Sequence, residues 1–351
     1  MTGDPKPDDD TTRVIAALER IAYMLERSRA ATPKVKAFRK AVDVVAELDP
    51  AELRRRVDAD TLTELAGIGA STGGVIAEAV RGEVPAYLAR LEAEAGPEPL
   101  ATGGEELQEL LRGDLHSHSD WSDGGSPIDV MARTARDAIG HDYLVLTDHS
   151  PRLTVANGLS PERLRKQLDV VAALNEELAP FRLLSGIEVD ILDDGAIDQE
   201  DELLERLDVV VASVHSKLRM DRDSMTKRMV AAVSNPRVDV LGHCTGRLIT
   251  GGRGTRPESE FDAEKVFTAC RDHAVAVEIN SRPERSDPPS RLIRLALEIG
   301  CFFSIDTDAH APGQLEFQAY GCARAVACGV PPERVVNTLG VDDLLAWTRA
   351  S

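Results

Sequence analysis

The stretch GDLHSHSDWSDGG, from Gly113 to Gly125, places His116, His118, Asp120 and Asp123 within a few positions of one another. Imidazoles mixed with carboxylates are the ligand set that proteins use for zinc, manganese or iron. Taken alone, the stretch is explained equally well as a polar surface loop. The choice depends on whether similar side chains recur at comparable places along the chain.

The elements that must position such side chains are strands. Short β-rich runs alternate with amphipathic helical runs from about residue 109 onward. The seven strand candidates are LLRGDLHS, YLVLTDHS, RLLSGIEVDIL, DVVVASVHS, VDVLGHCTG, AVAVEINS and CFFSIDTDAH. Seven such alternations predict a parallel sheet, and sheets built from this many βα units usually close into a barrel.

Metal-competent side chains end or follow most of these strand candidates. Because the carboxyl ends of barrel strands converge on one face, we expect these side chains to meet there. The predicted metal ligands are His116, His118, Asp123, His149, Glu188, His215, His243, Asp308 and His310. Nine ligands are too many for one tetrahedral zinc. They suit a cluster of two or three ions, which clamps a phosphoryl group and generates hydroxide at neutral pH.

Other chemistries lack support in the sequence. No G-x-S-x-G nucleophile motif follows a strand candidate, because the match GASTG at 69–73 lies in the helical segment. There is no phosphate-binding G-x-x-x-x-G-K-[ST]. The five cysteines contain no C-x-x-C pair, which argues against disulfides and a thiolate zinc site. No apolar run is long enough to span a membrane, and the acidic start MTGDPKPDDDTT is not a secretory signal. We therefore expect a cytoplasmic protein without a membrane partner.

The composition divides the chain into segments. We predict a disordered tail over 1–12, a helical domain over 13–95, a Pro/Gly/Glu-rich linker over 96–108 and the α/β domain over 109–351. The net charge of −19 disfavours nucleic-acid binding, because cationic side chains supply most of that affinity. The helical segment is nearly neutral, however, since residues 13–100 hold 13 Lys+Arg and 14 Asp+Glu.

Seven motifs in the α/β segment resemble those of the polymerase-and-histidinol-phosphatase (PHP) domain, in particular the PHP domain of bacterial family X DNA polymerases. They are DLHSHSDWSDG, YLVLTDHSP, GIEVDIL, SVHS, GHCTGRL, VEINSRPERSD and IDTDAHAPGQL, in this order. The resemblance covers residues 110–347. It implies a distorted (β/α)7 TIM-like barrel, phosphoesterase activity and up to three divalent ions (Zn, Mn or Fe).

The resemblance also implies how the ligands divide among the ions. His116, His118, Glu188 and Asp308 would hold the first ion. Asp123, His149 and His310 would hold the second, and Glu188, His215 and His243 the third, with Glu188 bridging.

The helical segment resembles the small N-terminal domain of the same polymerases, with a helix-hairpin-helix at LAGIG. In that motif Gly67, Ile68 and Gly69 would offer backbone N–H groups to a DNA phosphate. Val75 stands where relatives with lyase activity have their Schiff-base lysine, so we expect no such activity. The polymerase palm is absent between the two segments, so we expect no nucleotidyl transfer.

The leading hypothesis is a metal-dependent phosphoesterase acting on DNA 3′ ends or damaged DNA, as an exonuclease, 3′-phosphatase or abasic-site endonuclease. We expect catalysis to use Glu188, Asp308, His310 and Arg247. The side chains expected to hold substrate phosphate are Arg247, Lys217, Arg282 and Arg285. Asp114 and Asp148 are expected to orient imidazoles.

Three alternatives remain open. The first is a small-molecule phosphatase of the histidinol-phosphatase type, which needs the same metals but no helix-hairpin-helix. The second is a DNA-binding module that has lost catalysis. The third is an amidohydrolase, although those enzymes often bridge metals with a modified lysine on strand four, where this chain has His215. The oligomeric state is not predicted.

Overall fold

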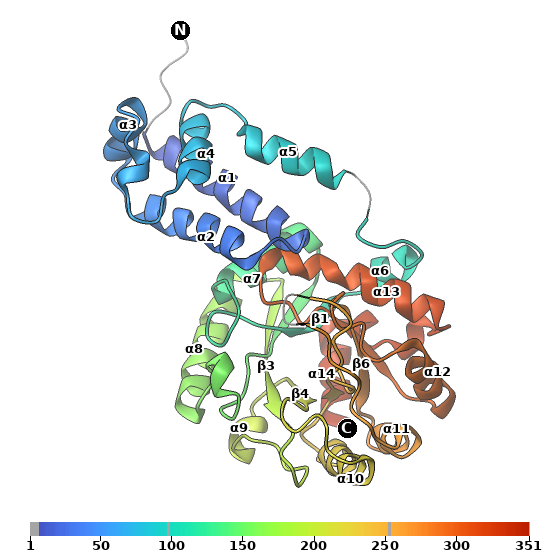
Figure 1. Cartoon of the computed structure of the whole chain (residues 1–351). Coiled ribbons are helices and arrows are strands. Elements are labelled where there is room, and N and C mark those ends of the chain that lie inside the picture. Colours follow the sequence, from blue (N-terminus) through green and yellow to red (C-terminus); the bar gives the residue numbers. More distant parts are fainter. Residues whose placement is uncertain (1–6, 97–98, 252–253, 351) are drawn as a thin grey trace. The chain divides into compact units, whose positions relative to one another are not determined.

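The computed structural model describes residues 7–96, 99–251 and 254–350, and the chain divides into two compact units at Glu98/Pro99 (Figure 1). The N-terminal unit is helical. Its helices are α1 (Pro7–Arg27), α2 (Thr32–Glu47), α3 (Pro50–Asp58), the short η1 (Leu62–Glu64), α4 (Ala70–Val80) and α5 (Ala86–Ala95). Apolar residues at helical spacing on α1, such as Leu18, Ile21 and Leu25, are buried in its core.

The predicted disordered tail is wrong for residues 7–12, because these residues form the first turns of α1. The remaining predicted tail residues, 1–6, lie outside the described part of the chain. Asp10 is buried and forms ion pairs with Arg13 and Arg54. Its carboxylate also lies near the helix N-terminus, where negative charge is favourable. An acidic composition was therefore misread as a signal of disorder.

The end of the predicted linker also has a different structure. Helix α6 (Glu105–Leu110) begins within it, and Leu107 is buried in the core of the second unit. Gly104 precedes the helix and lies so close to α13 (Gln318–Ala327) that a Cβ would meet the Ala323 nitrogen at 2.4 Å. A glycine that looked like a linker residue is thus required by close packing.

The second unit contains seven parallel strands in the order β1–β7, nearly closed into a barrel. The strands are β1 (Gly113–Ser117), β2 (Tyr143–Leu146), β3 (Arg182–Asp190), β4 (Val209–Ser213), β5 (Val240–Leu241), β6 (Ala276–Asn280) and β7 (Phe303–Asp306). The helices that cover them are α7 (Ile128–Thr134), α8 (Pro161–Leu178), α9 (Asp201–Leu204), α10 (Arg222–Val233), α11 (Ala263–Asp272), α12 (Ser290–Ile299), α13 and α14 (Val341–Ala350) (Figure 1). The predicted barrel class is confirmed.

The sequences of the strands are mostly apolar because both faces of each strand are covered. All five residues of β4, VVVAS, are buried, as are those of β6, AVEIN. Helix α8 begins at a capping serine that is followed by a proline. The Ser160 hydroxyl accepts a hydrogen bond from the Arg163 N–H at 3.3 Å, and Pro161 opens α8.

Side chains join β1 to β7 where the barrel closes. The Asp114 carboxylate on β1 accepts hydrogen bonds from the backbone N–H and the hydroxyl of Thr307. In return, the Leu115 N–H donates to Asp306 Oδ1 at 3.0 Å. One backbone bond, from the His118 N–H to the Ala309 oxygen at 2.8 Å, completes this seam. The first and last predicted ligand motifs therefore lie side by side.

Within the described residues, no helix is both long and apolar enough to cross a membrane.

Candidate metal centre

Glu188, on β3, is surrounded by imidazoles from four other strand ends. Its Oε2 atom lies 3.3 Å from Nε2 of His116 and 2.9 Å from Nδ1 of His149. Its Oε1 atom lies 3.0 Å from Nε2 of His243 and 3.2 Å from Nε2 of His215. The carboxylate is fully buried. The barrel thus brings side chains far apart in sequence to one carboxylate.

Two aspartates extend the group toward its open side. Asp308 Oδ1 lies 3.3 Å from Nε2 of His118. Asp123 Oδ1 lies 3.3 Å from Nε2 of His310 and 3.4 Å from Nε2 of His149. Asp308 has a left-handed backbone conformation, with φ at 51°. That conformation is uncommon outside glycine, and strained residues of this kind cluster at functional sites.

All nine predicted ligands are therefore brought together, and three subsets have ligand atoms within 4.8 Å of one another. These subsets are His118, Asp123, His149 and His310; His116, His118 and Asp308; and His149, Glu188 and His215. The grouping differs from the predicted division in four respects. His118 and His149 each belong to two subsets. Glu188 belongs only to the subset of His149 and His215, and His243 belongs to none, although it lies beside Glu188.

The donor atoms fit a cation. Buried nitrogens and oxygens without a well-formed hydrogen bond to the protein are concentrated here. They include His116 Nε2, His118 Nδ1 and Nε2, His149 Nδ1, both oxygens of Glu188, His215 Nδ1 and His243 Nδ1. The ion-pair distances given above are short, but these contacts lack the angles of hydrogen bonds. Orphaned polar atoms are costly in a protein interior, so such a concentration indicates a ligand.

The imidazoles differ in whether their surroundings lower or raise their pKa. Burial and the neighbouring His310 lower the pKa of His118 to about 3, so its ring is neutral and has a free lone pair. Burial also lowers the pKa of His149, but Glu188 and Asp123 outweigh it and raise that pKa to about 10. Burial likewise raises the pKa of the Glu188 carboxyl, yet the surrounding imidazoles hold it well below its usual value. A cation that binds here must displace protons from some of these rings.

The imidazoles are oriented by residues other than the predicted pair. Glu278 Oε1, on β6, lies 2.6 Å from Nδ1 of His116, and Asp190 Oδ1 lies 3.3 Å from Nδ1 of His215. The assignment of this role to Asp114 and Asp148 is wrong. Asp114 closes the barrel seam, and Asp148 binds loop hydroxyls and an amide. Glu278 was missed, although an acid inside the apolar run AVEIN was a signal for a buried role.

A cavity of about 630 Å³ opens onto the cluster. Arg282 and Arg285, two of the residues predicted to hold phosphate, line it, and both contact Asp308, with Arg285 Nε 3.2 Å from Oδ2. Arg219 and Arg256 also line this cavity and were not predicted. They lie in loops after β4 and β5 that carry no periodic signal.

The other two predicted phosphate-binding residues lie elsewhere. Among the described residues, those that line the metal cavity do not include Lys217 or Arg247. Lys217 is exposed and forms an ion pair with Asp193. Arg247 uses its Nε to donate to the carbonyl oxygens of Arg285 and Ser286, both at 3.1 Å. A direct catalytic role for Arg247 therefore has no support in its position.

The predicted DNA-contacting hairpin lies between η1 and α4 in the N-terminal unit. Gly67 has φ at 98° and is exposed, while Ile68 is buried in the helical core. The Gly69 N–H donates to the Thr72 hydroxyl at 2.9 Å, so this group is already bonded within the protein. In the second turn of α4, Val75 is buried and offers no amine.

Comparisons with known proteins identify a family model and several relatives. A family model for the PHP domain matches residues 114–282. The chain is 38% identical over 246 residues to the DNA polymerase/3′-5′ exonuclease PolX of Bacillus subtilis, which covers 70% of this chain and 42% of that protein. It is 28% identical over 209 residues to a probable phosphatase of Thermoanaerobacter sp., covering 56% of this chain and 78% of the relative.

Among solved structures, the histidinol phosphate phosphatase of Lactococcus lactis matches 63% of this chain and 94% of its own, with 17% identity and a TM-score of 0.44. The chain spans less than half the length of the polymerase relative. The family match over 114–282 coincides with the strands that carry most of the cluster. Residues 114–282 therefore form a PHP domain, and the chain is similar in sequence to PolX and to probable phosphatases.

Proposed function

We propose that the chain is a metal-dependent hydrolase of phosphate esters. The observation that carries this proposal is the set of buried, orphaned imidazole and carboxylate atoms around Glu188, which face a cavity lined by four arginines. Cations on the imidazoles and carboxylates would leave a cavity whose remaining charged side chains are all positive. Such a cavity selects an anionic group next to the ions.

The proposed occupants of the cluster are up to three divalent ions, with zinc, manganese and iron as candidates. The division of ligands would follow the family pattern given above, with Glu188 shared. When bound, such ions supply Lewis acidity toward a phosphoryl oxygen and a nucleophile at neutral pH. Glu278 and Asp190 would hold the rings of His116 and His215 in the ligating orientation.

The arginines of the cavity would hold the phosphoryl group. Arg282 and Arg285 contact Asp308 through ion pairs and would be released toward substrate when Asp308 binds a cation. Arg219 and Arg256 line the same cavity from other loops. Planar guanidinium groups suit the oxygens of a phosphate and stabilise charge that develops during its displacement.

The proposed substrate is DNA, at 3′ ends or damaged sites, without nucleotidyl transfer. The relative that carries an exonuclease in its name supports this choice, as does the exposed hairpin at Gly67 in a nearly neutral helical unit. The lining of the metal cavity is also consistent with an anionic substrate. Its three carboxylates, Asp123, Glu188 and Asp308, are all proposed metal ligands, so none is left to bind a cationic group.

A second candidate is a phosphatase for a small monoester. A relative named a probable phosphatase supports it, since this chain covers 78% of that protein. A volume of about 630 Å³ is also sufficient for a small molecule. A cationic monoester such as histidinol phosphate would, however, meet four arginines in this cavity.

A substrate panel tests both candidates. The metal-stripped protein would be assayed with nicked DNA, 3′-phosphate DNA and histidinol phosphate, with Mn²⁺ and Zn²⁺ added back separately. We expect hydrolysis of DNA only when metal is present, and none by Asp308→Ala. Turnover of the small monoester alone would favour the second candidate. DNA binding that needs no metal and leads to no hydrolysis would favour a non-catalytic module, and activity that survives Asp308→Ala would refute the site.

A further inference from the structure

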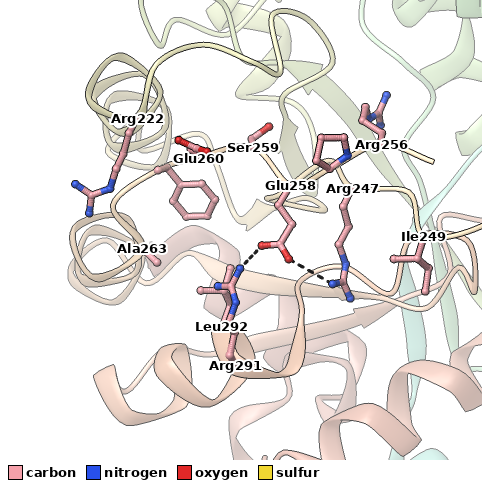
Figure 2. Close-up of a pocket in the computed structure, with 12 residues that line it drawn as sticks. Arg222, Arg247, Ile249, Arg256, Glu258, Ser259, Glu260, Ala263, Arg291 and Leu292 are labelled. Atoms are coloured by element: carbon pink, nitrogen blue, oxygen red, sulfur yellow. Dashed lines mark hydrogen bonds and ion pairs between the residues drawn. The ribbon is translucent and has the colours of Figure 1, made fainter.

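Figure 2 shows the residues that line a second cavity, also of about 630 Å³. Arginines dominate its charged lining, with Arg222, Arg247 and Arg291 in addition to Arg256. None of the nine predicted metal ligands lines it. The cavity is therefore not part of the metal centre. Its positive charge indicates that it binds a separate ligand or a separate part of the substrate.

The two cavities share a wall. Arg256 lines both of them, and its backbone pairs with that of Leu248 through two hydrogen bonds of 2.9 Å. Leu248 lines the metal cavity, and the next residue, Ile249, lines the second. The Ser259 hydroxyl, on the second cavity, donates to the Leu218 carbonyl oxygen at 2.8 Å, and Leu218 lines the metal cavity. One layer of residues thus separates the two spaces.

The charge of this region is opposite to that of the whole protein. Seven different arginines line the two cavities, in a chain with a net charge of −19. The second cavity holds two carboxylates, Glu258 and Glu260, against four arginines. A concave surface of one sign focuses its field and concentrates ligands of the opposite sign. An anion is therefore the ligand class that fits.

Glu258 marks where that anion would bind. Figure 2 shows its carboxylate between Arg247 and Arg291, with an interaction drawn to each. The Arg247 Nη1 atom lies 3.5 Å from Oε1, and Arg291 forms an ion pair with Oε2. Two guanidinium groups that converge on a carboxylate can also take a phosphate, which has similar oxygens and more charge. Phe261 adds apolar surface of the kind on which a base can stack.

We propose that the second cavity binds a second phosphate of the substrate, so that the substrate is a nucleic-acid strand and not a monoester. One phosphate ester would lie at the metal cluster, and the neighbouring phosphodiester would cross Arg256 to reach Arg222, Arg247 and Arg291. This inference rests on the proposed function and narrows its substrate class.

The test compares a trinucleotide that carries a 3′-phosphate with a deoxynucleoside 3′-monophosphate. In the double variant Arg222→Gln/Arg291→Gln, the ratio of kcat/KM for the trinucleotide to that for the mononucleotide should fall about tenfold. Both side chains are more than half exposed, so the fold should tolerate the change. Glu258→Gln should act in the opposite direction and raise affinity for the trinucleotide several-fold. Arg237→Gln is the matched control, since Arg237 pairs with Asp201 and Glu205 instead.

A binding measurement separates failure of this inference from failure of the proposed function. Affinity of the Mn²⁺-loaded protein for a phosphorothioate trinucleotide would be measured over a range of salt concentrations. The slope of log affinity against log salt should decrease by about 0.7 in the double variant, the value for one lost phosphate contact on a single strand. An unchanged slope and an unchanged kcat/KM ratio would overturn the second subsite, as would weaker binding by Glu258→Gln. Absence of hydrolysis of every ester would refute the proposed function, while the slope would still report on the cavity.

Discussion

Asp148 and Glu188 are both buried acids near the carboxyl ends of neighbouring strands, but their oxygens have different surroundings. Asp148 accepts hydrogen bonds from the Ser119 N–H at 2.8 Å, the hydroxyls of Ser119 and Ser122, and the Gln167 amide at 2.6 Å. Glu188 has no well-formed hydrogen bond to either oxygen and is surrounded by imidazoles. The oxygens of Asp148 are hydrogen-bonded within the protein, whereas those of Glu188 are available to a ligand.

Structural acids and ligating acids in this barrel differ in the donors that surround them. Hydroxyl and amide donors satisfy a carboxylate without adding a metal-binding atom. Imidazoles can supply a lone pair to a cation once they lose their proton. Burial alone does not separate the two cases, because both acids are almost inaccessible. The two cases are separated by whether the neighbouring groups are hydroxyls and amides or imidazoles.

The largest effect should follow from Glu188→Gln. Losing the shared carboxylate should lower kcat by about a thousandfold or more. We expect Mn²⁺ or Zn²⁺ to raise the Tm of the parent protein, and the substitution should abolish that rise. Steady-state kinetics and thermal unfolding with and without metal would check both. Asp120→Asn is the control from the neighbouring loop, because Asp120 is exposed, and it should behave like the parent. Normal metal-dependent stabilisation of Glu188→Gln would contradict its role.

Asp148→Asn should damage stability instead. An amide keeps one acceptor oxygen but places an NH2 group against donors, so the free energy of unfolding should fall by about 2–3 kcal/mol. Urea unfolding would measure this loss, and the metal-induced rise in Tm should persist. If Asp148→Asn removed metal binding while leaving stability intact, the distinction between the two acids would fail.

Glu278→Gln should have an intermediate effect on function. Glu278 holds Nδ1 of His116 at 2.6 Å, and loss of such outer partners typically costs 10- to 100-fold in metal affinity. We expect a loss of about tenfold in Mn²⁺ affinity, measured by titration of the metal-stripped protein, with activity restored at high metal concentration. Failure of excess metal to rescue activity would show that Glu278 acts in another way.

The smallest effect concerns Asp239, a buried acid at the other end of the barrel, just before β5. Burial and the nearby Asp208 raise its pKa to about 8, whereas an unfolded aspartate titrates near pH 4. The native state therefore holds an extra proton between these values. Stability from this group is complete below about pH 4 and decreases as pH rises toward 8. The free energy of unfolding should drop by at least about 1 kcal/mol from pH 5 to pH 8, and Asp239→Asn should remove that drop. An identical pH profile in the variant would contradict the assignment.

Sequence reasoning succeeded where geometry follows from the fold class. A parallel barrel brings strand ends together, so a histidine after β1 and an aspartate after β7 could be placed in one group without knowing any loop. It failed where the conformation of a loop determines which atoms a side chain contacts. Asp148 was assigned to an imidazole because the sequence does not reveal that the 119–122 loop folds over it. Arg219 and Arg256 were missed for the same reason, and Arg247 was misplaced because its binding to backbone carbonyls depends on the 285–286 turn.

The seam between β1 and β7 has a consequence for how the protein acquires its site during synthesis. Asp114 and Thr307, which join the two strands, are 193 positions apart, and the ligands of β1 and β7 flank this pair. Bringing such distant segments together costs loop-closure entropy and makes their pairing slow. An incomplete chain on the ribosome would carry the β1 histidines without the β7 aspartate. Metal loading would therefore be among the last events of maturation, after the barrel has closed.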